Sequence, residues 1–376
     1  MKRVLLITNF CPFYRVKLFK ILTEETPIQI VFYSRGQEKY WEQKNNQGGN
    51  FKDSIYLAAD GAGKIKILWR LFKQLCRKDL KGIIQGFNGA PYIMLGFCVA
   101  KLRGLPYGLW TGMWYHPETF FHTLSRPLVN YIYRHIDYAV VYGTHVRDYL
   151  IAHGTPAEKI FIAQNTADNE LYSKNPTPEE KEALIKELEI KDGIPTALFV
   201  GRFTEVKGLR YLLKALTLLK TPLHTVLIGH GEEKAWCEKV VAEHKLSVHF
   251  TDYVANEKLY AYYHLAEIVV MPSVSTKTVK EAWGLTVNEA MNQGCVVVAS
   301  DAVGAAAGGL VEDGKTGFVV PEKNAEALAE ALEKLCTDKA LLQKMSVAAK
   351  EKIVGWDYQK MAEGFKEVCA LLEEHA

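Results

Sequence analysis

The stretch MPSVSTKTVKEAWGLTVNEAMNQGCVVVAS, residues 271–300, decides the fold. It predicts a strand that ends near Pro272, a loop, a short helix over 285–292 and a second strand over 295–299. Gly294 is the expected helix stop, since glycine readily adopts the left-handed conformation that ends a helix. The valine run at the end has the length and composition of a buried parallel strand.

Two glutamates, Glu281 and Glu289, lie eight positions apart in this stretch. The first amides of the predicted helix lie beside a loop glycine, and unpaired N–H groups at such a place suit a phosphate. Glu289 lies one turn inside the helix, where its carboxylate could accept hydrogen bonds from a ribose. Glu281 lies in the loop and could accept from sugar hydroxyls. Alternatively, both glutamates are solvated and have no ligand.

The chain of 376 residues is long enough for two domains, or for one large domain. Hydrophobic residues make up 48% and charged residues 24%, as in an ordinary globular protein. Seven cysteines include no C-x-x-C pair, which disfavours a disulfide framework or a zinc site and favours a reduced cytosolic compartment. The first residues have the pattern of a strand rather than of a signal peptide. No stretch of apolar residues approaches the roughly 20 that a membrane-spanning helix needs.

Charge is distributed unevenly along the chain. Residues 1–182 hold 24 Lys and Arg against 16 Asp and Glu, whereas the remainder holds 22 against 27. This asymmetry indicates a polyanionic partner for the first half. We expect no nucleic acid, because no RNP, zinc-finger or helix-turn-helix signature is present.

Strand-like runs alternate with helical patterns from the start, which implies a parallel sheet covered on both faces. A polar, proline-bearing stretch over 165–181 is the best linker candidate, and the alternation restarts at residue 196. We therefore predict domains over 1–170 and 171–355. The tail over 356–376 has the pattern of an amphipathic helix.

The segment over 63–82, GKIKILWRLFKQLCRKDLKG, combines seven Lys and Arg with Trp and Phe. A basic amphipathic helix of this kind can lie on an anionic bilayer. The alternative is a helix that packs in the core and has a solvated basic side. The sequence favours neither.

Phosphate chemistry is suggested by the turn GRFTEVKG after the strand over 196–200. Gly201 permits close approach of the backbone, and Arg202 and Lys207 place two cations beside a helix that begins at Gly208. The next strand ends in another such turn, with Gly229 and Gly231. A Walker A sequence is absent, and so is a D-x-D pair, so we expect neither ATP-type phosphoryl transfer nor a metal-held diphosphate. The alternative is a basic turn without a ligand.

His116 follows the strand predicted over 107–110, in the loop WTGMWYHPE. Loops at the carboxyl ends of strands are where α/β proteins place their sites. His116 is therefore a candidate site residue, although a single loop histidine is more often structural or solvated.

The ordered set G-R-x4-K-G, I-G-x-G and P-S…E-x-W-G-L-x3-E-A-M…G…V-V-x-S-D resembles the retaining group-1 glycosyltransferases of the GT-B fold. The resemblance is greatest over residues 196–320. It implies an α/β protein with two Rossmann-like domains whose parallel sheets face a central cleft. The N-terminal domain would bind the acceptor, the C-terminal domain would bind a nucleotide-sugar donor of the UDP or GDP type, and the last helix would cross back onto the N-terminal domain.

The resemblance also implies roles for individual residues. Arg202 and Lys207 would hold the leaving diphosphate without a metal, Glu281 would contact the transferred sugar and Glu289 the ribose. His116 would lie near the reacting centre. The remaining donor contacts would come from the glycines of the two strand-end turns and from the loop before the helix: Gly201, Gly229, Gly231, Trp283, Gly284, Leu285 and Thr286.

The chain departs from the family after its first strand, where many members have a Gly-Gly loop and this chain has CPFYRV over 11–16. We expect Arg15 to substitute there as an anion contact. The expected function is a metal-independent retaining hexosyltransferase that makes cell-envelope polysaccharide such as lipopolysaccharide. Its acceptor would be a glycan or a lipid-linked glycan, and its location cytoplasmic, with peripheral membrane contact through 63–82.

Two alternatives remain open at this point. Nucleotide-sugar 2-epimerases share the GT-B fold, and an epimerase would convert the donor into a new nucleotide sugar without an acceptor. An inactive sugar-nucleotide binding module is the other alternative, against which the complete set Arg202, Lys207, Glu281 and Glu289 argues. The sequence specifies neither the base and sugar of the donor, nor the acceptor and linkage, nor the oligomeric state.

Overall fold

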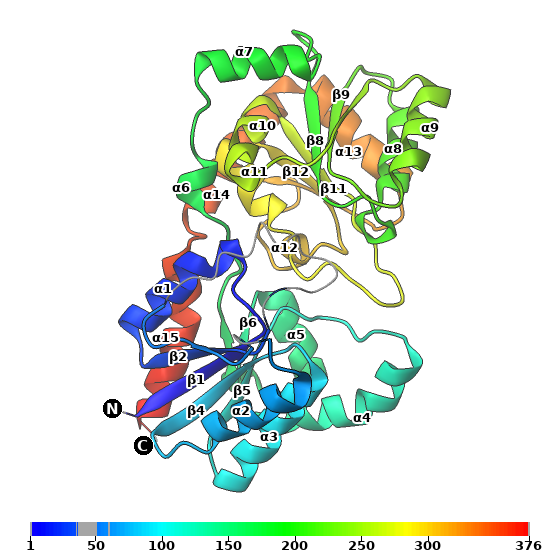
Figure 1. The fold of residues 1–376 in the computed structure, drawn as a ribbon. Coiled ribbons are helices and arrows are strands. Elements are labelled where there is room, and N and C mark those ends of the chain that lie inside the picture. The colour runs from blue at the N-terminus through cyan, green and yellow to red at the C-terminus, as the bar shows by residue number, and fades with distance from the viewer. Residues whose placement is uncertain (1, 35, 37–50, 59–60, 375–376) are drawn as a thin grey trace. The chain divides into compact units, whose positions relative to one another are not determined.

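The computed structural model describes residues 2–34, 36, 51–58 and 61–374. Its contacts divide the chain into two compact units (Figure 1). Unit 1 comprises residues 1–116, 120–165 and 358–376, and unit 2 comprises residues 117–119 and 166–357. The first main boundary therefore falls before Thr166 rather than after residue 170. Thr166 Oγ1 donates to the Trp356 carbonyl at 2.6 Å, which ties together the two ends of unit 2.

Unit 1 is built on a seven-stranded parallel sheet of order β3-β2-β1-β4-β5-β6-β7. Successive residues of β1 alternate between its two faces, with Leu5 and Ile7 in one core and Val4 and Leu6 in the other. Both faces are apolar, as expected of a parallel sheet that helices cover on both sides. The strands are β1 (Arg3–Thr8), β2 (Ile28–Phe32), β3 (Ile55–Tyr56), β4 (Leu80–Gly86), β5 (Tyr107–Thr111), β6 (Tyr138–Val141) and β7 (Ile160–Ile162).

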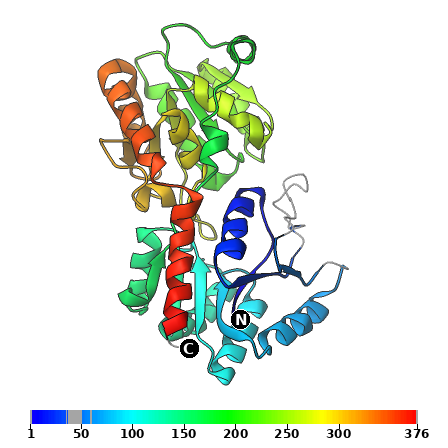
Figure 2. The same cartoon turned by 90° about the vertical axis from the view of Figure 1, so that its left-hand side faces the viewer.

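Two helix layers cover this sheet. One layer holds α2 (Lys64–Leu75), α3 (Ala90–Arg103), α4 (Phe120–His135) and α5 (Thr144–Ala152). The other pairs α1 (Val16–Glu25) with the last helix, α15 (Tyr358–Glu374), which runs along the sheet in Figure 2. The end of the chain thus completes the core of unit 1. Residues 375 and 376 of the predicted tail helix lie outside the described residues.

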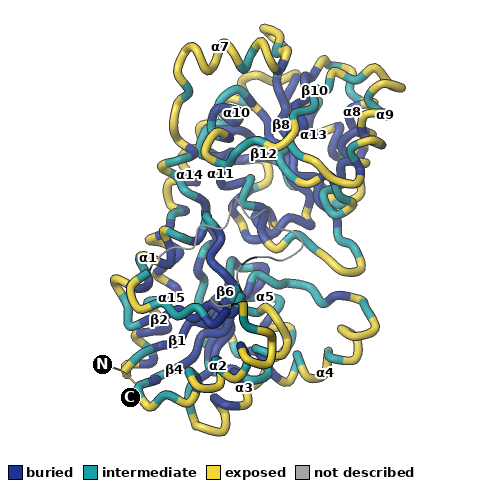
Figure 3. Tube along the Cα trace, viewed as in Figure 1, coloured by how far each residue is buried: buried dark blue, intermediate teal, exposed yellow. Residues whose placement is uncertain are grey.

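Unit 2 repeats the plan with six parallel strands in the order β10-β9-β8-β11-β12-β13. Its four central strands are mostly dark with burial in Figure 3, whereas the edge strand β10 is half-buried and the outer turns of the helices are exposed. The strands are β8 (Thr196–Val200), β9 (His224–Ile228), β10 (Val248–Thr251), β11 (Ile268–Met271), β12 (Val296–Ser300) and β13 (Gly317–Val320). The longer helices are α7 (Pro178–Glu187), α8 (Leu209–Leu218), α9 (Lys234–His244), α10 (Leu259–Leu265), α11 (Thr286–Gln293), α13 (Ala325–Thr337) and α14 (Lys339–Val354), with one-turn α6 (Asn169–Tyr172) and α12 (Gly304–Ala307).

Both sheets place their first strand in the middle and add later strands on either side. The direction of strand addition reverses between β1 and β4 in unit 1, and between β8 and β11 in unit 2. At such a reversal the following loops diverge to opposite faces and leave a crevice at the carboxyl ends of the strands. The fold therefore offers one natural binding position in each unit.

Two predicted elements need correction. The linker over 165–181 is partly helical, because Thr177 and Glu180 form a reciprocal capping box that starts α7 at Pro178. The basic segment over 63–82 is helical only over Lys64–Leu75, since β4 begins at Leu80.

Candidate functional site

The reversal point of unit 2 brings together loops that are far apart in sequence. Lys207 lies in the loop after β8, and Glu281 lies in the loop after β11. The Val274 amide donates to the Val206 carbonyl at 2.8 Å, which joins the two loops directly. The candidate site is therefore built on the carboxyl edge of two adjacent strands.

Lys207 and Glu281 form the central contact of this site. Lys207 Nζ lies 2.5 Å from Glu281 Oε2, and the Ser273 hydroxyl donates to the same oxygen at 3.3 Å. Both side chains of the ion pair are largely buried, with 16% and 18% of their surface exposed. The pair is thus preorganised, but a polar ligand could still reach it.

Charge at this site favours an ionised Glu281. Burial alone would raise the pKa of the carboxyl, but the Lys207 ammonium, the Ser273 hydroxyl and the positive charge of Arg202 together hold the pKa below its usual range. Arg202 is itself exposed. The Glu281 carboxylate therefore pairs with Lys207 at the edge of the sheet, and the charge of Arg202 stabilises its ionised form.

Glycines hold the surrounding loops against one another. A Cβ at Gly229 would lie 1.9 Å from the carbonyl oxygen of Gly201, and a Cβ at Gly231 would lie 2.3 Å from that of Phe203. The predicted reason for these glycines was close approach of a ligand. The observed contacts give another reason, because the turns after β8 and β9 pack backbone against backbone.

The helix α11 begins at Thr286, one residue after the predicted start, and no side chain of its N-cap residue caps its first turn. Leu285 and Thr286 are half-buried, and Gly284 has a φ of +90° that glycine adopts without strain. Trp283 is buried, and its indole donates to Asn288 Oδ1 at 2.7 Å. The Trp283 side chain thus anchors the loop from inside the unit. The predicted contact of Trp283 with the donor involves its backbone amide, not its side chain.

Glu289 lies deeper than Glu281. It is only 8% exposed, and its Oε2 accepts a hydrogen bond of 2.7 Å from the Tyr263 hydroxyl on α10. Burial raises the pKa of this carboxyl, and the hydrogen bond from Tyr263 opposes that shift. The alternative of a solvated Glu289 is therefore wrong, whereas its contact with a ribose stays a prediction.

Arg15 does not lie where an anion could reach it. It is 3% exposed, its guanidinium donates to Asn165 Oδ1 at 2.5 Å, and it lies about 5 Å from the rings of Tyr14, Trp110 and Tyr142. This placement contradicts the predicted donor contact. The physical reason is that α15 and the surrounding aromatic rings enclose the guanidinium in the core of unit 1.

His116 lies in unit 1, in the loop after β5. Its Nε2 lies 2.8 Å from the His122 carbonyl oxygen in the first turn of α4. The side chain therefore fastens the loop to the start of a helix. A role near the reacting centre stays a prediction.

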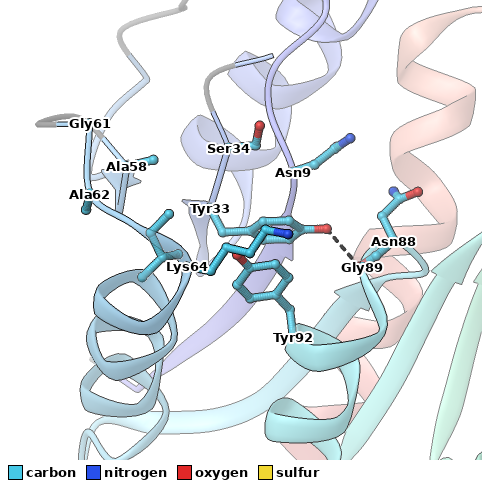
Figure 4. Close-up of a pocket in the computed structure, with 11 residues that line it drawn as sticks. Asn9, Tyr33, Ser34, Ala58, Gly61, Ala62, Lys64, Asn88, Gly89 and Tyr92 are labelled. Carbon is cyan, nitrogen blue, oxygen red and sulfur yellow. Dashed lines mark hydrogen bonds between the residues drawn. The ribbon is translucent and has the colours of Figure 1, made fainter. Parts of the chain in front are cut away.

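A cavity of about 590 Å³ occupies the reversal point of unit 1 (Figure 4). Asn9 follows β1, Ser34 follows β2 and Asn88 follows β4, so polar side chains from three strand ends line it. Tyr33 and Tyr92 stack at its base, with ring centroids 4.1 Å apart, and Lys64 lines it from α2. Stacked rings, amides and a cation suit a polar ligand with a flat apolar face, such as a sugar.

Sequence reasoning missed most residues of this cavity, and also Ser273 and Tyr263. A signal existed for Asn9, since a polar residue directly follows a buried strand. For Tyr33, Asn88 and Tyr92 the grouping depends on strand order, which a single sequence does not display.

Comparison with known proteins gives a family match for most of unit 2. Residues 180–352 match the group 1 glycosyl transferases. The matched segment contains Arg202, Lys207, Glu281 and Glu289. The candidate site of unit 2 therefore lies wholly within the part of the chain that is similar to these transferases.

Characterised relatives agree with the family match over part of their length. The alpha-D-kanosaminyltransferase of Streptomyces kanamyceticus is 30% identical over 240 residues, which cover 61% of this chain and 60% of that protein. The D-inositol 3-phosphate glycosyltransferase of Corynebacterium urealyticum is 32% identical over 162 residues, 39% of this chain and 37% of that protein. The chain thus spans well under two thirds of the length of these relatives.

Solved structures show the fold over the whole chain. HepE of Anabaena, in complex with UDP and glucose, covers 98% of this chain and 100% of its own at a TM-score of 0.75 and 18% identity. The match to the sucrose-phosphate synthase of Thermosynechococcus elongatus covers 100% of both chains, with a TM-score of 0.73 and 19% identity. The predicted fold class, α/β with two Rossmann-like units of the GT-B type, is confirmed.

Across the described residues, every helix is too short or too polar to span a bilayer.

Proposed function

We propose that this chain is a retaining glycosyltransferase that uses a nucleotide-diphosphate sugar. The observation that carries the proposal is the Lys207–Glu281 pair at the reversal point of unit 2, with Arg202 close enough to stabilise the ionised carboxylate. Two cations beside an uncapped helix start suit a diphosphate, and a fixed carboxylate suits sugar hydroxyls. HepE, with the same fold, binds UDP, so UDP sugars are the first donors to test, followed by GDP sugars.

The proposed roles follow from the geometry. Lys207 and Arg202 stabilise the negative charge that grows on the diphosphate as the bond from sugar C1 to the phosphate oxygen breaks. An acceptor hydroxyl forms the new bond to C1 on the same face of the sugar, and its proton passes to the leaving phosphate oxygen. Because protein cations supply the charge stabilisation, the proposal needs no metal ion.

The acceptor is proposed to bind in the cavity of unit 1. A volume of about 590 Å³ lies within the usual range for small-ligand sites, which is roughly 300–1,000 Å³. The stacked Tyr33–Tyr92 pair can cover the apolar face of a sugar ring, while Asn9, Ser34 and Asn88 bond its hydroxyls. A glycan or lipid-linked glycan of the cell envelope fits this lining, and α2, which supplies Lys64, would bring the enzyme to the cytoplasmic face of the membrane.

Release of UDP or GDP from donor sugars, in the presence of glycan acceptors, tests the proposal. Lys207→Ala and Glu281→Ala should each reduce kcat by about 10²–10³-fold, the usual loss on removal of one transition-state contact. Lys214→Ala is the matched control, since Lys214 forms an exposed ion pair with Glu326 in the same unit. Near-normal turnover in both site variants would refute the assignment.

Two readouts on the wild-type enzyme test the finer claims. The anomeric configuration of the product, measured by NMR, should equal that of the donor; an inverted product contradicts retention. EDTA should leave the rate unchanged. A loss that Mg²⁺ or Mn²⁺ restores contradicts the metal-independent mechanism.

A further inference from the structure

Exposed apolar side chains are concentrated on one helix layer of unit 1. Of the fifteen large hydrophobic residues that are exposed in the described part of the chain, nine lie on α2, α3 and α4. We call these nine the docking face: Ile65, Trp69, Phe72, Leu102, Phe120, Phe121, Leu124, Leu128 and Tyr131. By contrast, α1 and α15, on the other side of the same sheet, contribute none. Scattered exposed apolar residues are normal, but a cluster of this size marks an interaction surface.

Helix α4 has two apolar faces. Its inner face packs Ile132 and Tyr133 into the core of unit 1. Its five docking-face residues, from Phe120 to Tyr131, fall within about 100° of arc on another side of the helix, at 100° per residue. Phe120, Phe121 and Leu124 are 78%, 77% and 71% exposed. A helix that is apolar on two sides needs a second partner, and the core supplies only the first.

Helix α2 packs in the core through one face, which is one of the two alternatives that the sequence left open, and it has a second, exposed face. Ile67, Leu71 and Leu75 are buried in the core. Ile65 and Trp69 point outward, 85% and 56% exposed, and Lys73 Nζ lies 5.4 Å above the Trp69 ring. The tryptophan is thus held among lysines at the surface.

The helices that carry the docking face also share one sign of charge. Together α2, α3 and α4 contain eight Lys and Arg and no Asp or Glu. On the opposite side of the sheet, α1 and α15 contain four Lys and six Glu. The three helices adjoin: α2 packs on α3, and Phe97 of α3 meets Tyr131 of α4 with ring centroids 6.2 Å apart. Figure 1 shows them together in unit 1. The docking face therefore consists of exposed apolar residues on three neighbouring helices that carry positive charge.

We propose that this face binds an anionic lipid bilayer, with Phe120, Phe121 and Leu124 inserted among the headgroups and acyl chains. Exposed aromatic and aliphatic side chains beside positive charge are the features that bind amphipathic helices to anionic lipid. A second copy of the chain would meet the same positive charge, which disfavours self-association through this face. Protein interfaces also tend to be depleted of lysine, whereas α2 alone holds three lysines.

The binding surface does not depend on the proposed catalytic activity, but it deepens that proposal. A face on α2 and α4 would keep unit 1, with its cavity, at the bilayer surface where lipid-linked acceptors are found. Membrane binding and nucleotide binding are measured separately, so failure of either proposal can be recognised without the other.

Co-sedimentation with vesicles tests the proposal on the full chain. The wild type should bind phosphatidylcholine vesicles that contain about 30 mol% phosphatidylglycerol, and high salt should weaken the binding. The triple variant Phe120→Ser, Phe121→Ser, Leu124→Ser should bind at least about tenfold more weakly. The matched control Val347→Ser, Val354→Ser changes exposed apolar residues of α14 in unit 2 and should bind as the wild type does.

A second pair of variants tests the charge. Lys66→Glu with Lys73→Glu should abolish the preference for anionic vesicles, whereas Lys239→Glu on exposed α9 should not. Quenching of tryptophan fluorescence by brominated lipid should fall in Trp69→Phe. Circular dichroism shows whether each variant is folded.

Three results would overturn the inference. The first is absence of wild-type binding to anionic vesicles at low salt. The second is equal binding by the triple serine variant while it remains folded. The third is a concentration-dependent dimer of the wild type in sedimentation velocity that the triple variant loses, without vesicle binding, since this would make the face a subunit interface.

Discussion

At the scale of single residues, Glu281 and Glu289 have the same chemistry and opposite environments. Lys207, Ser273 and Arg202 outweigh burial at Glu281 and lower its pKa, whereas burial dominates at Glu289 and raises its pKa. The two carboxyls of the E-x7-E pattern therefore differ in the ease with which they ionise. That difference suits Glu281 to a position between cations, and it makes Glu289 sensitive to pH.

Glu289→Gln tests this difference through stability. The pKa of Glu289 is higher in the folded state than in the unfolded state, where it is about 4.3. Glu289 therefore stabilises the fold when the pH is below the unfolded-state pKa. This stabilisation is lost as the pH rises through the folded-state pKa. Glutamine is neutral at every pH and can still accept from Tyr263. The melting temperature of the variant should equal that of the wild type near pH 4 and exceed it by about 2–4 °C at pH 7. A variant that melts lower than the wild type at pH 7 would contradict a burial-dominated Glu289.

Residue-scale prediction from sequence succeeded where local pattern was sufficient. Lys207 and Glu281 could each be named from the strand-end loop that holds it, whereas the ion pair between them was not predicted. The prediction that Arg15 contacts an anion failed, because its environment is formed by Trp110, Tyr142 and α15, which come from other parts of the chain. A cation in a loop looks the same in sequence whether it faces solvent or three aromatic rings.

At the scale of elements, the loops of the unit 2 site depend on glycines that lie against other backbone. A Cβ at Gly208 would lie 1.9 Å from the carbonyl oxygen of Pro272, at a φ of +66°. Gly314 has a similar φ of +71°, but open space surrounds its Cβ position. An alanine would therefore adopt the same strained backbone at both positions, but it would clash with a neighbouring carbonyl only at Gly208.

Gly208→Ala compared with Gly314→Ala isolates that clash. Both variants should lose stability from the left-handed backbone. Gly208→Ala should also displace the loop that holds Lys207 and weaken nucleotide binding, measured by calorimetry, by about tenfold or more, because small misplacements at a site are costly. Equal affinities in the two folded variants would show that the Gly208–Pro272 contact does not position the site.

Most elements were predictable because their periodicity is strong. The strand β8 has the predicted bounds, and β12 and α11 are each shifted by one residue. The missed elements are short or lie in polar sequence: β3 has two residues, and α7 is largely exposed. The sequence nevertheless contained a signal for the start of α7. Thr177 and Glu180 form a capping box around Pro178, and this motif outweighs the linker-like composition.

At the scale of the whole molecule, unit 1 is discontinuous in sequence. Met361, Phe365 and Val368 of α15 are completely buried against the sheet that begins with β1. The last helix is therefore part of the core of unit 1. Unit 2 keeps its own sheet and helices between residues 166 and 357.

Truncation after Gly355 should therefore affect the two units unequally. Loss of α15 exposes one apolar face of the seven-stranded sheet, so unit 1 should lose its cooperative structure, whereas unit 2 should remain folded. Hydrogen exchange should show β1 and β4 amides unprotected and β8 and β11 amides protected. Protection of β1 and β4 at wild-type levels would contradict the assignment of α15 to the core of unit 1.

Strand order is the property of the whole molecule that sequence did not supply. The alternation of strands and helices predicted parallel sheets, but it did not say that β8 adjoins β11 or that β1 adjoins β4. Those two pairings bring Lys207 to Glu281, and Asn9 to Asn88. The candidate residues of unit 2 could thus be named from the sequence, whereas the cavity of unit 1 could not.

The central claim is that a nucleoside diphosphate binds at the Lys207–Glu281 pair, and a thermal-shift panel of UDP, GDP and ADP tests it most directly. A ligand at 100 times its Kd stabilises the native state by about 2.7 kcal/mol. We predict that one nucleotide raises the melting temperature of the wild type and of Lys214→Ala by several degrees but leaves Lys207→Ala unshifted. No shift with any nucleotide, or an equal shift in Lys207→Ala, would contradict the account.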